Sequence, residues 1–180
     1  SFIITDGENT TSTATPAMVR DEMHKAVTDE ILESHIMVVI GMGMETGIVA
    51  AGIDAQHPPH VYILDDVSLR GSGEQWGRAA LESYRTWRAA EVVPEVNLGG
   101  LVLTTLRLLD PQVRLHRKGD RVGVRASQGK RARAEPVATL AEQGRLHQVG
   151  TFPALENKLC GWDPRESWSP DRFDAMVWAV

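Results

Sequence analysis

The sequence predicts an α/β domain in which a mixed β-sheet is covered by helices on both faces. Three short apolar runs follow one another closely from Ile36 onward, later strand-like runs alternate with helical patterns, and turn residues separate them. The closely spaced runs favour an antiparallel meander, and the later alternation favours parallel strands. Hydrophobic residues make up 42% of the 180 residues and charged residues 24%, which is ordinary for one globular domain.

The meander consists of three apolar runs bounded by Gly, Pro or Asp. We assign its strands to "IMVVIGMG" (36–43), "TGIVAAGID" (46–54) and "HVYILDDVS" (60–68). A helix is predicted over "GSGEQWGRAALESYRTWRAA" (71–90). Its stripe of Trp76, Ala80, Tyr84 and Trp87 is typical of core packing.

Strands and helices alternate in the second half of the chain. The predicted strands are "EVVPEVN" (91–97), "RVGVRAS" (121–127) and "LHQVG" (146–150). The predicted helices are "GGLVLTTLRLLD" (99–110), "RARAEPVATLAEQG" (131–144, closed by Gly144), a helix or turn at "FPALENKLCGW" (152–162), and the final "SPDRFDAMVWAV" (169–180).

Residues 1–34 differ in composition from the rest. The stretch "TDGENTTSTATP" is polar and rich in Thr, which predicts a flexible segment. The following "AMVRDEMHKAVTDEILES" has apolar residues near helical spacing and predicts an amphipathic helix. We expect this region to be a linker from an upstream domain or an added leader, and residues 35–180 to form the folded domain.

Charge is distributed unevenly along the chain. The net charge is -5, but residues 114–133 hold eight Lys or Arg and one acid, Asp120, so the rest carries -12. This distribution predicts one anion-facing surface and one acidic site, although a solvated basic loop is the commoner explanation of a charge run taken alone. No apolar stretch reaches the ~20 residues of a membrane helix and no signal-peptide pattern is present, so we expect a cytoplasmic protein with no membrane partner.

Glu95 and Asp174 are the acids that local structure explains least. Glu95 ends an apolar strand before "NLGG", and such strand ends collect binding groups in α/β sheets. Asp174 lies one turn inside the final helix among apolar residues, whereas Asp171 suits the helix N-terminus after Ser169 and Pro170. Because a carboxylate near a buried face needs a partner, the two acids predict a shared Mg²⁺ or Mn²⁺. A cap or a loop salt bridge for Glu95 is the alternative.

Several segments resemble, in the same order, the C-terminal nuclease domain of bacteriophage terminase large subunits. They are "TGIVAAG", "YILDDVS", "EQWGRAALESYRTWRAAEVVPEVNLGG", "VRASQGKRARAEPVATLAEQGRLHQVGTFPALENKL" and "SPDRFDAMVWA", within residues 36–180. The resemblance implies an RNase H-like fold. It also implies an endonuclease that cuts concatemeric double-stranded DNA with acidic residues holding two divalent ions.

By the same resemblance Glu95 and Asp174 would be the catalytic metal ligands, and Asp171 could assist them. The segment "RASQGKRARAEP" would face the DNA phosphates through Arg125, Ser127, Lys130, Arg131 and Arg133. No Walker-type nucleotide loop is present in the sequence. We therefore expect the terminase ATPase domain to be a partner, together with the portal and the small terminase subunit.

The chain departs from the family at the end of its first strand. The family has an aspartate in an Asp-Pro pair there and a second aspartate just ahead of "ETGI", whereas this sequence reads "MVVIGMGMETGIV". Glu45 and Asp66 are the nearest substitutes as metal ligands. The departure leaves two other hypotheses open: a catalytically impaired module that binds DNA or docks on the motor without cutting, and another RNase H-like enzyme such as a junction resolvase.

Overall fold

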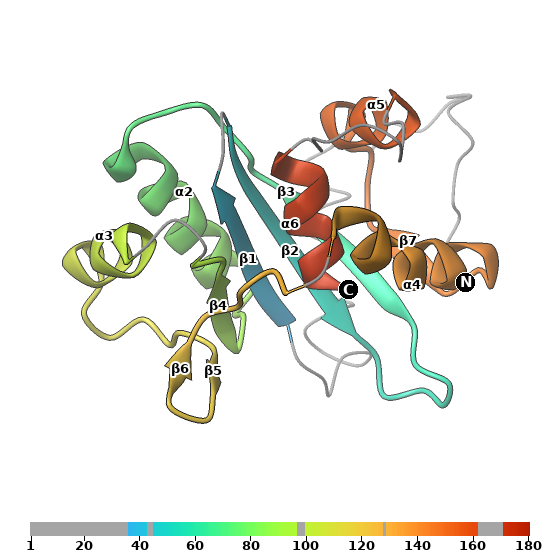
Figure 1. The fold of residues 1–180 in the computed structure, drawn as a ribbon, viewed down its shortest axis with the longest axis horizontal. Coiled ribbons are helices and arrows are strands. Elements are labelled where there is room, and N and C mark those ends of the chain that lie inside the picture. Colours follow the sequence, from blue (N-terminus) through green and yellow to red (C-terminus); the bar gives the residue numbers. More distant parts are fainter. Residues whose placement is uncertain (1–35, 43–44, 97–99, 128, 162–170) are drawn as a thin grey trace, which may run out of the picture.

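The computed structural model describes residues 36–42, 45–96, 100–127, 129–161 and 171–180, and its centre is a five-stranded sheet with the order β4-β1-β2-β3-β7 (Figure 1). β1 pairs antiparallel with β2, and β2 with β3. β4 and β7 flank these three strands and run parallel to β1 and β3. The predicted mixed sheet is therefore confirmed, with strands β1 (Ile36–Met42), β2 (Thr46–Ile53), β3 (Val61–Asp66), β4 (Glu91–Pro94) and β7 (Leu146–Gln148).

Helices cover both faces of the sheet, as predicted (Figure 1). Along β1, Val38 and Ile40 join the core on one face and Val39 joins the core on the other, which is the alternation expected of a strand buried on both sides. The first face carries α2 (Gly73–Thr86) and α3 (Leu101–Leu109), and the second carries α6 (Asp171–Ala179) with α4 (Lys130–Glu142) and α5 (Pro153–Gly161) beside it. No helix among these described segments is long and apolar enough to cross a bilayer.

The predicted stripe of α2 packs in the core. Trp76 and Ala80 are buried, and Tyr84 packs against them while partly exposed. Trp87 ends the helix in the core, and its indole N–H donates to the Asp65 carboxylate at 3.1 Å. This bond satisfies the polar atom that burial of a tryptophan otherwise leaves without a partner.

The segment predicted as a strand at 121–127 is mostly irregular, so this prediction is wrong in detail. Only Arg121–Val122 forms a strand, β6, and it pairs with β5 (Arg117–Lys118) in a ribbon outside the main sheet. Gly119, with φ of 62°, lies in the turn between β5 and β6, and Gly123, with φ of 77°, lies against β4, where a Cβ would overlap the Pro94 carbonyl. The open edge of β4 is still covered, because single parallel bridges form on either side of the ribbon, joining Val92 to Leu115 and Glu95 to Val124.

Helix α6 lies close to β2 because position 47 is glycine. A Cβ at Gly47 would overlap the backbone carbonyl of Asp171. Gly47 is the register partner of Gly41 on β1, so the first turn of α6 lies over the ends of both strands. The predicted helix cap at Ser169 and Pro170 and the predictions for residues 1–34 lie outside the described residues.

Candidate acidic site and its cationic rim

The structure places Glu95 and Asp174 together where β4 meets the first turns of α6. The backbone N–H of Glu95 donates to the Ile40 carbonyl at 2.8 Å, which holds Glu95 beside the end of β1. Asp174 is buried on α6, one turn before Trp178, whose indole N–H donates to Glu95 Oε1 at 3.2 Å. The two predicted acids therefore share one site, and α6 orients both.

Burial makes this site unfavourable for negative charge. Burial raises the pKa of Glu95 above its ordinary value, although the hydrogen bond from Trp178 and the nearby Arg133 act in the opposite direction. Burial also raises the pKa of Asp171, even though that carboxylate accepts the backbone N–H of Glu45 at 2.7 Å. Such a site favours any positive charge that can approach the carboxylates.

Two cationic side chains from the start of α4 supply positive charge. Lys130 Nζ lies 3.2 Å from Asp174 Oδ2, and Arg133 Nη2 lies 3.5 Å from Asp174 Oδ1. The Arg133 guanidinium also stacks over the Trp178 ring at 4.9 Å. Its Nε and Nη1 atoms are buried with no hydrogen-bond acceptor among the described residues, so part of its donor capacity is unused.

The other predicted DNA contacts lie on the surface before and at the start of α4. Arg125 and Ser127 are exposed on the segment that leads into the helix. Arg131 is exposed as well and forms a solvent-facing pair with Glu135, at 3.4 Å. Gly129 caps α4 without a side-chain hydrogen bond, and the first turn holds no acid. The helix N-terminus and its cations therefore form a positive rim beside the acids.

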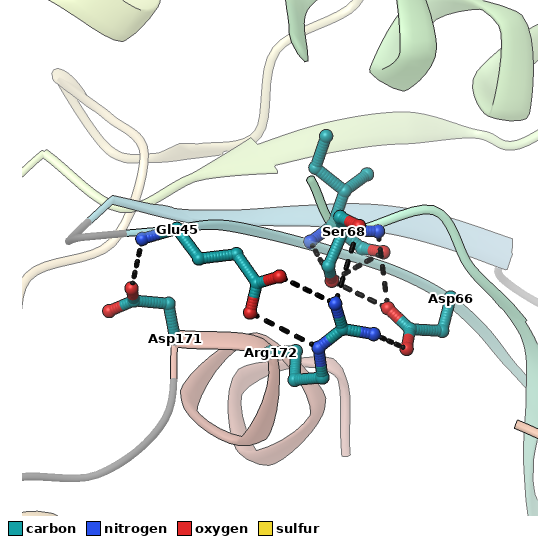
Figure 2. A network of polar contacts seen from close by, with 6 residues as sticks. Glu45, Asp66, Ser68, Asp171 and Arg172 are labelled. Atoms are coloured by element: carbon teal, nitrogen blue, oxygen red, sulfur yellow. Dashed lines mark hydrogen bonds and ion pairs between the residues drawn. The ribbon is translucent and has the colours of Figure 1, made fainter. Parts of the chain in front are cut away.

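A separate ionic cluster is centred on Arg172, which follows Asp171 in the first turn of α6 (Figure 2). Its Nη2 and Nε donate to the Glu45 carboxylate at 2.6 and 3.2 Å, and its Nη1 donates to Asp66 Oδ2 at 2.6 Å. Asp66 also accepts the hydroxyl of Ser68 at 2.5 Å. Hydrogen bonding to Arg172 lowers the pKa of Glu45, so the Glu45 carboxylate stays ionised at neutral pH.

This cluster explains what Glu45 and Asp66 do in the structure. Both were candidate metal ligands, but their carboxylates are paired with Arg172, and the side chain of Asp66 is only 3% exposed. Their contacts with Arg172 tie the ends of β2 and β3 to α6. Through Asp171, which accepts the N–H of Glu45, the cluster also fixes the position of the acidic site.

Gly41 lies near the end of β1, in the stretch where the resembled family has an aspartate, and it faces the acidic site. A Cβ there would lie 3.6 Å from Glu95 Oε2, 3.6 Å from the Asp171 carbonyl and 3.8 Å from the Ala175 nitrogen, all ordinary contact distances. A side chain at this position would therefore reach Glu95 without displacing the backbone. Among the described residues, no three acidic, His or Cys side chains are grouped as a metal site.

The oxygen donors of Glu95 and Asp174 suit one divalent ion that takes its remaining ligands from water and a phosphate. They do not suit two ions. A second dication needs further carboxylates. Of those that the sequence offered, Glu45 and Asp66 are paired with Arg172, and Asp171 accepts the backbone N–H of Glu45.

Sequence reasoning did not identify Arg172 or Trp178 as parts of the site. Arg172 is 127 positions from Glu45, and Trp178 is 83 positions from Glu95. Neither residue belongs to a local motif. The one available signal was an arginine set between two aspartates at the start of an apolar helix, which indicates a buried cation with acidic partners.

Comparison with known proteins finds solved structures with a similar fold. No protein-family model matches the sequence, and no curated protein matches it. The solved structures that match include the nuclease domain of human cytomegalovirus terminase soaked with Mn, with a TM-score of 0.56 and 11% sequence identity over 89% of this chain and 91% of that one. The inhibitor-bound form of the same domain matches with a TM-score of 0.55 and 12% identity over the same shares. The chain thus has a terminase nuclease-like fold, and the predicted RNase H-like class is confirmed.

Proposed function

We propose that this chain is the nuclease domain of a bacteriophage DNA-packaging terminase and that it hydrolyses concatemeric double-stranded DNA beside Glu95 and Asp174. The observation that supports this best is the meeting of these two acids, from β4 and α6, next to the cations of α4. An acid pair beside a cationic rim suits a phosphodiester, because the rim holds the phosphates while the acids face the reacting group.

In this proposal Glu95 and Asp174 hold a divalent ion, Mg²⁺ or Mn²⁺. When bound, the ion polarises the phosphoryl oxygen and lowers the pKa of the attacking water. Trp178 fixes the orientation of Glu95, and the first turn of α6 fixes that of Asp174. With only two protein carboxylates, ion binding is expected to depend on a phosphate from the DNA.

The cations of α4 have two roles in the proposal. In the free protein, Lys130 and Arg133 neutralise Asp174. When DNA enters, its phosphates compete for these cations and release the carboxylate. The unused buried donors of Arg133 supply further hydrogen bonds to a phosphate once the side chain moves. Arg125, Ser127 and Arg131 extend this contact along the backbone of the duplex without reading its sequence.

A plasmid-cleavage assay tests the nuclease activity. With Mn²⁺ or Mg²⁺ the wild type is expected to convert supercoiled DNA to nicked and linear forms, and Glu95→Ala or Asp174→Ala to lower the rate at least 100-fold. Glu82→Ala, which removes an exposed acid from α2, is the matched control and should cut like the wild type. Equal cleavage by all four proteins would point to a contaminating nuclease and refute the assignment.

A module that holds DNA or docks on the packaging motor without cutting is the second candidate. Gly41 favours it, because the end of β1 provides no carboxylate. Its partners would be double-stranded DNA and the terminase ATPase domain, portal and small subunit. Titration calorimetry with Mn²⁺ in the presence of DNA distinguishes the two: ion binding that Glu95→Ala abolishes would exclude a module without a metal site, and absence of cleavage with intact DNA binding would support the non-cutting module.

A further inference from the structure

A second group of cations lies at the other end of β4 from Glu95. Three arginines line a surface hollow of about 400 Å³, and all three are exposed. None of them has an acidic partner within ion-pair distance among the described residues. The lining consists of Glu91, Arg107, Val113, Arg114, Leu115 and Arg117.

The single acid of this hollow is already engaged. Glu91 Oε1 lies 2.7 Å from Nδ1 of His116, so the ring nitrogen donates to the carboxylate. The Glu91 charge is therefore directed at His116, and the hollow keeps an excess of positive charge. Like charges held close together are unfavourable without an anion.

A comparison with the neighbouring hollow shows that this arrangement is specific. A hollow of about 340 Å³ between α2 and α3 is also lined by arginines, Arg78 and Arg85. Each of these is neutralised by an acid at 2.8 Å: Arg78 by Glu74, and Arg85 by Asp110. The exposed arginines of this neighbouring hollow are thus paired with acids, whereas those of the first have no acid within ion-pair distance among the described residues.

The adjacent β5–β6 ribbon continues the positive surface. Lys118 and Arg121 are exposed and are direct register partners across the ribbon. Like charges opposite each other in a β-ladder are destabilising, so this pair favours an anion lying over it. Asp120 is the one acid in the turn. A row of cations along a hollow and a ribbon suits an extended polyanion better than a single phosphate.

We infer that the hollow of Arg107, Arg114 and Arg117, with the β5–β6 ribbon, binds the phosphate backbone of a DNA duplex away from the acidic site. This inference rests on the proposed function for the choice of DNA as the polyanion. β4 separates the two sites by about 13 Å, the rise of four strand residues. That length corresponds to about four base-pair steps, so one duplex reaches both sites.

The test is DNA binding in EDTA, so that no divalent ion contributes. A fluorescent 24-base-pair duplex is titrated between 50 and 200 mM salt with the wild type, with Arg114→Gln/Arg117→Gln, and with Arg78→Gln/Arg85→Gln. The two double variants lose the same charge, but only the first pair is unpaired in the structure. The slope is that of the logarithm of the binding constant against the logarithm of the salt concentration. We expect it to be less steep by about 1.8 in the first variant, so that the affinity of this variant relative to wild type changes about 12-fold across this salt range. The second should keep the wild-type slope, and melting temperatures check that all three proteins are folded.

Each outcome decides a different point. Equal slopes for the two double variants would overturn the inference and leave the nuclease proposal standing, and would indicate a different anionic partner for this surface. A reduced slope for the first variant alone, combined with a wild type that fails to cut plasmid, would support the inference and refute the nuclease activity. A wild type that binds no duplex at 50 mM salt would refute both.

Discussion

Substituting Gly41 by aspartate is expected to add a ligand to the metal site proposed at Glu95 and Asp174. Position 41 lies at the end of β1, and its Cβ would contact Glu95 Oε2, the Asp171 carbonyl and the Ala175 nitrogen at 3.6 to 3.8 Å. These are ordinary contacts, so the side chain fits without moving α6. The introduced carboxylate then extends toward Glu95 and adds an acid to the site from the end of β1.

Without metal this variant is expected to be less stable than the wild type. Two carboxylates about 5 Å apart repel each other by about 3 kcal/mol at an effective dielectric constant of 20. For a protein of this size, that corresponds to a melting temperature lower by about 6–12 °C. A divalent ion reverses the sign, because the same carboxylates then become its ligands. An ion present at 100 times its dissociation constant stabilises the folded state by about 2.7 kcal/mol, which is most of the loss.

Thermal unfolding in EDTA and in Mn²⁺ measures both effects, and Gly41→Asn is the matched control because it has nearly the same shape without the charge. We expect Gly41→Asp to melt below Gly41→Asn in EDTA and to gain several degrees more from Mn²⁺. Equal Mn²⁺ shifts for the two variants would refute the reasoning, because the introduced carboxylate would then not reach the ion that Glu95 holds.

Three further substitutions test other parts of the site. Arg172→Met leaves Glu45 without its buried cation and should cost about 3 kcal/mol of unfolding free energy, measured with urea. Gly47→Ala forces a Cβ against the Asp171 carbonyl and should cost about 1–3 kcal/mol. Glu95→Gln should change how stability depends on pH. Burial raises the pKa of Glu95 in the folded state. The stability that protonated Glu95 contributes is therefore fully present below the unfolded-state pKa and is lost as pH rises through the folded-state pKa. Relative to wild type, the free energy of unfolding of Glu95→Gln should then rise from pH 4 to pH 7.

Matched variants give each of these a control. Arg85→Met breaks the exposed pair with Asp110 and should cost under about 1 kcal/mol; a cost as large as that of Arg172→Met would contradict the role of burial. Gly41→Ala places a Cβ at ordinary distances in the paired strand, so a loss equal to that of Gly47→Ala would show that contact with α6 is not the cause. A constant stability difference between Glu95→Gln and wild type from pH 4 to pH 7 would show that the pKa of Glu95 is not raised.

The sequence predicts the order of elements well, because local chemistry determines most of it. The three meander strands are apolar runs that stop at Gly, Pro or Asp, and the structure has strands at each. The strand predicted at 121–127 fails for a local reason as well. Gly119 and Gly123 adopt positive φ and convert an apolar alternation into a ribbon, and a sequence pattern does not show which glycines will do so.

The site is predictable in part. Glu95 and Asp174 stand out because an acid beside apolar residues needs a partner, and the structure brings them together. What the acids pair with depends on contacts between distant segments. The sequence does not indicate that Arg172 would pair with Glu45 and Asp66, or that Lys130 and Arg133 would reach Asp174, since these pairs form only when α4, α6 and the strand ends meet.

The two glycines of the site have different physical roles, and the difference bears on what the domain does. Gly47 is required by packing, because any side chain would strike the Asp171 carbonyl. Gly41, its register partner, has room for a side chain that would point at Glu95. The fold therefore has room for an acid at position 41. Because this position is a glycine, the site has one possible metal ligand fewer, while its shape is the same. A protein with this site should bind divalent ions weakly alone and more tightly with DNA, because the phosphate supplies the oxygen that the end of β1 does not.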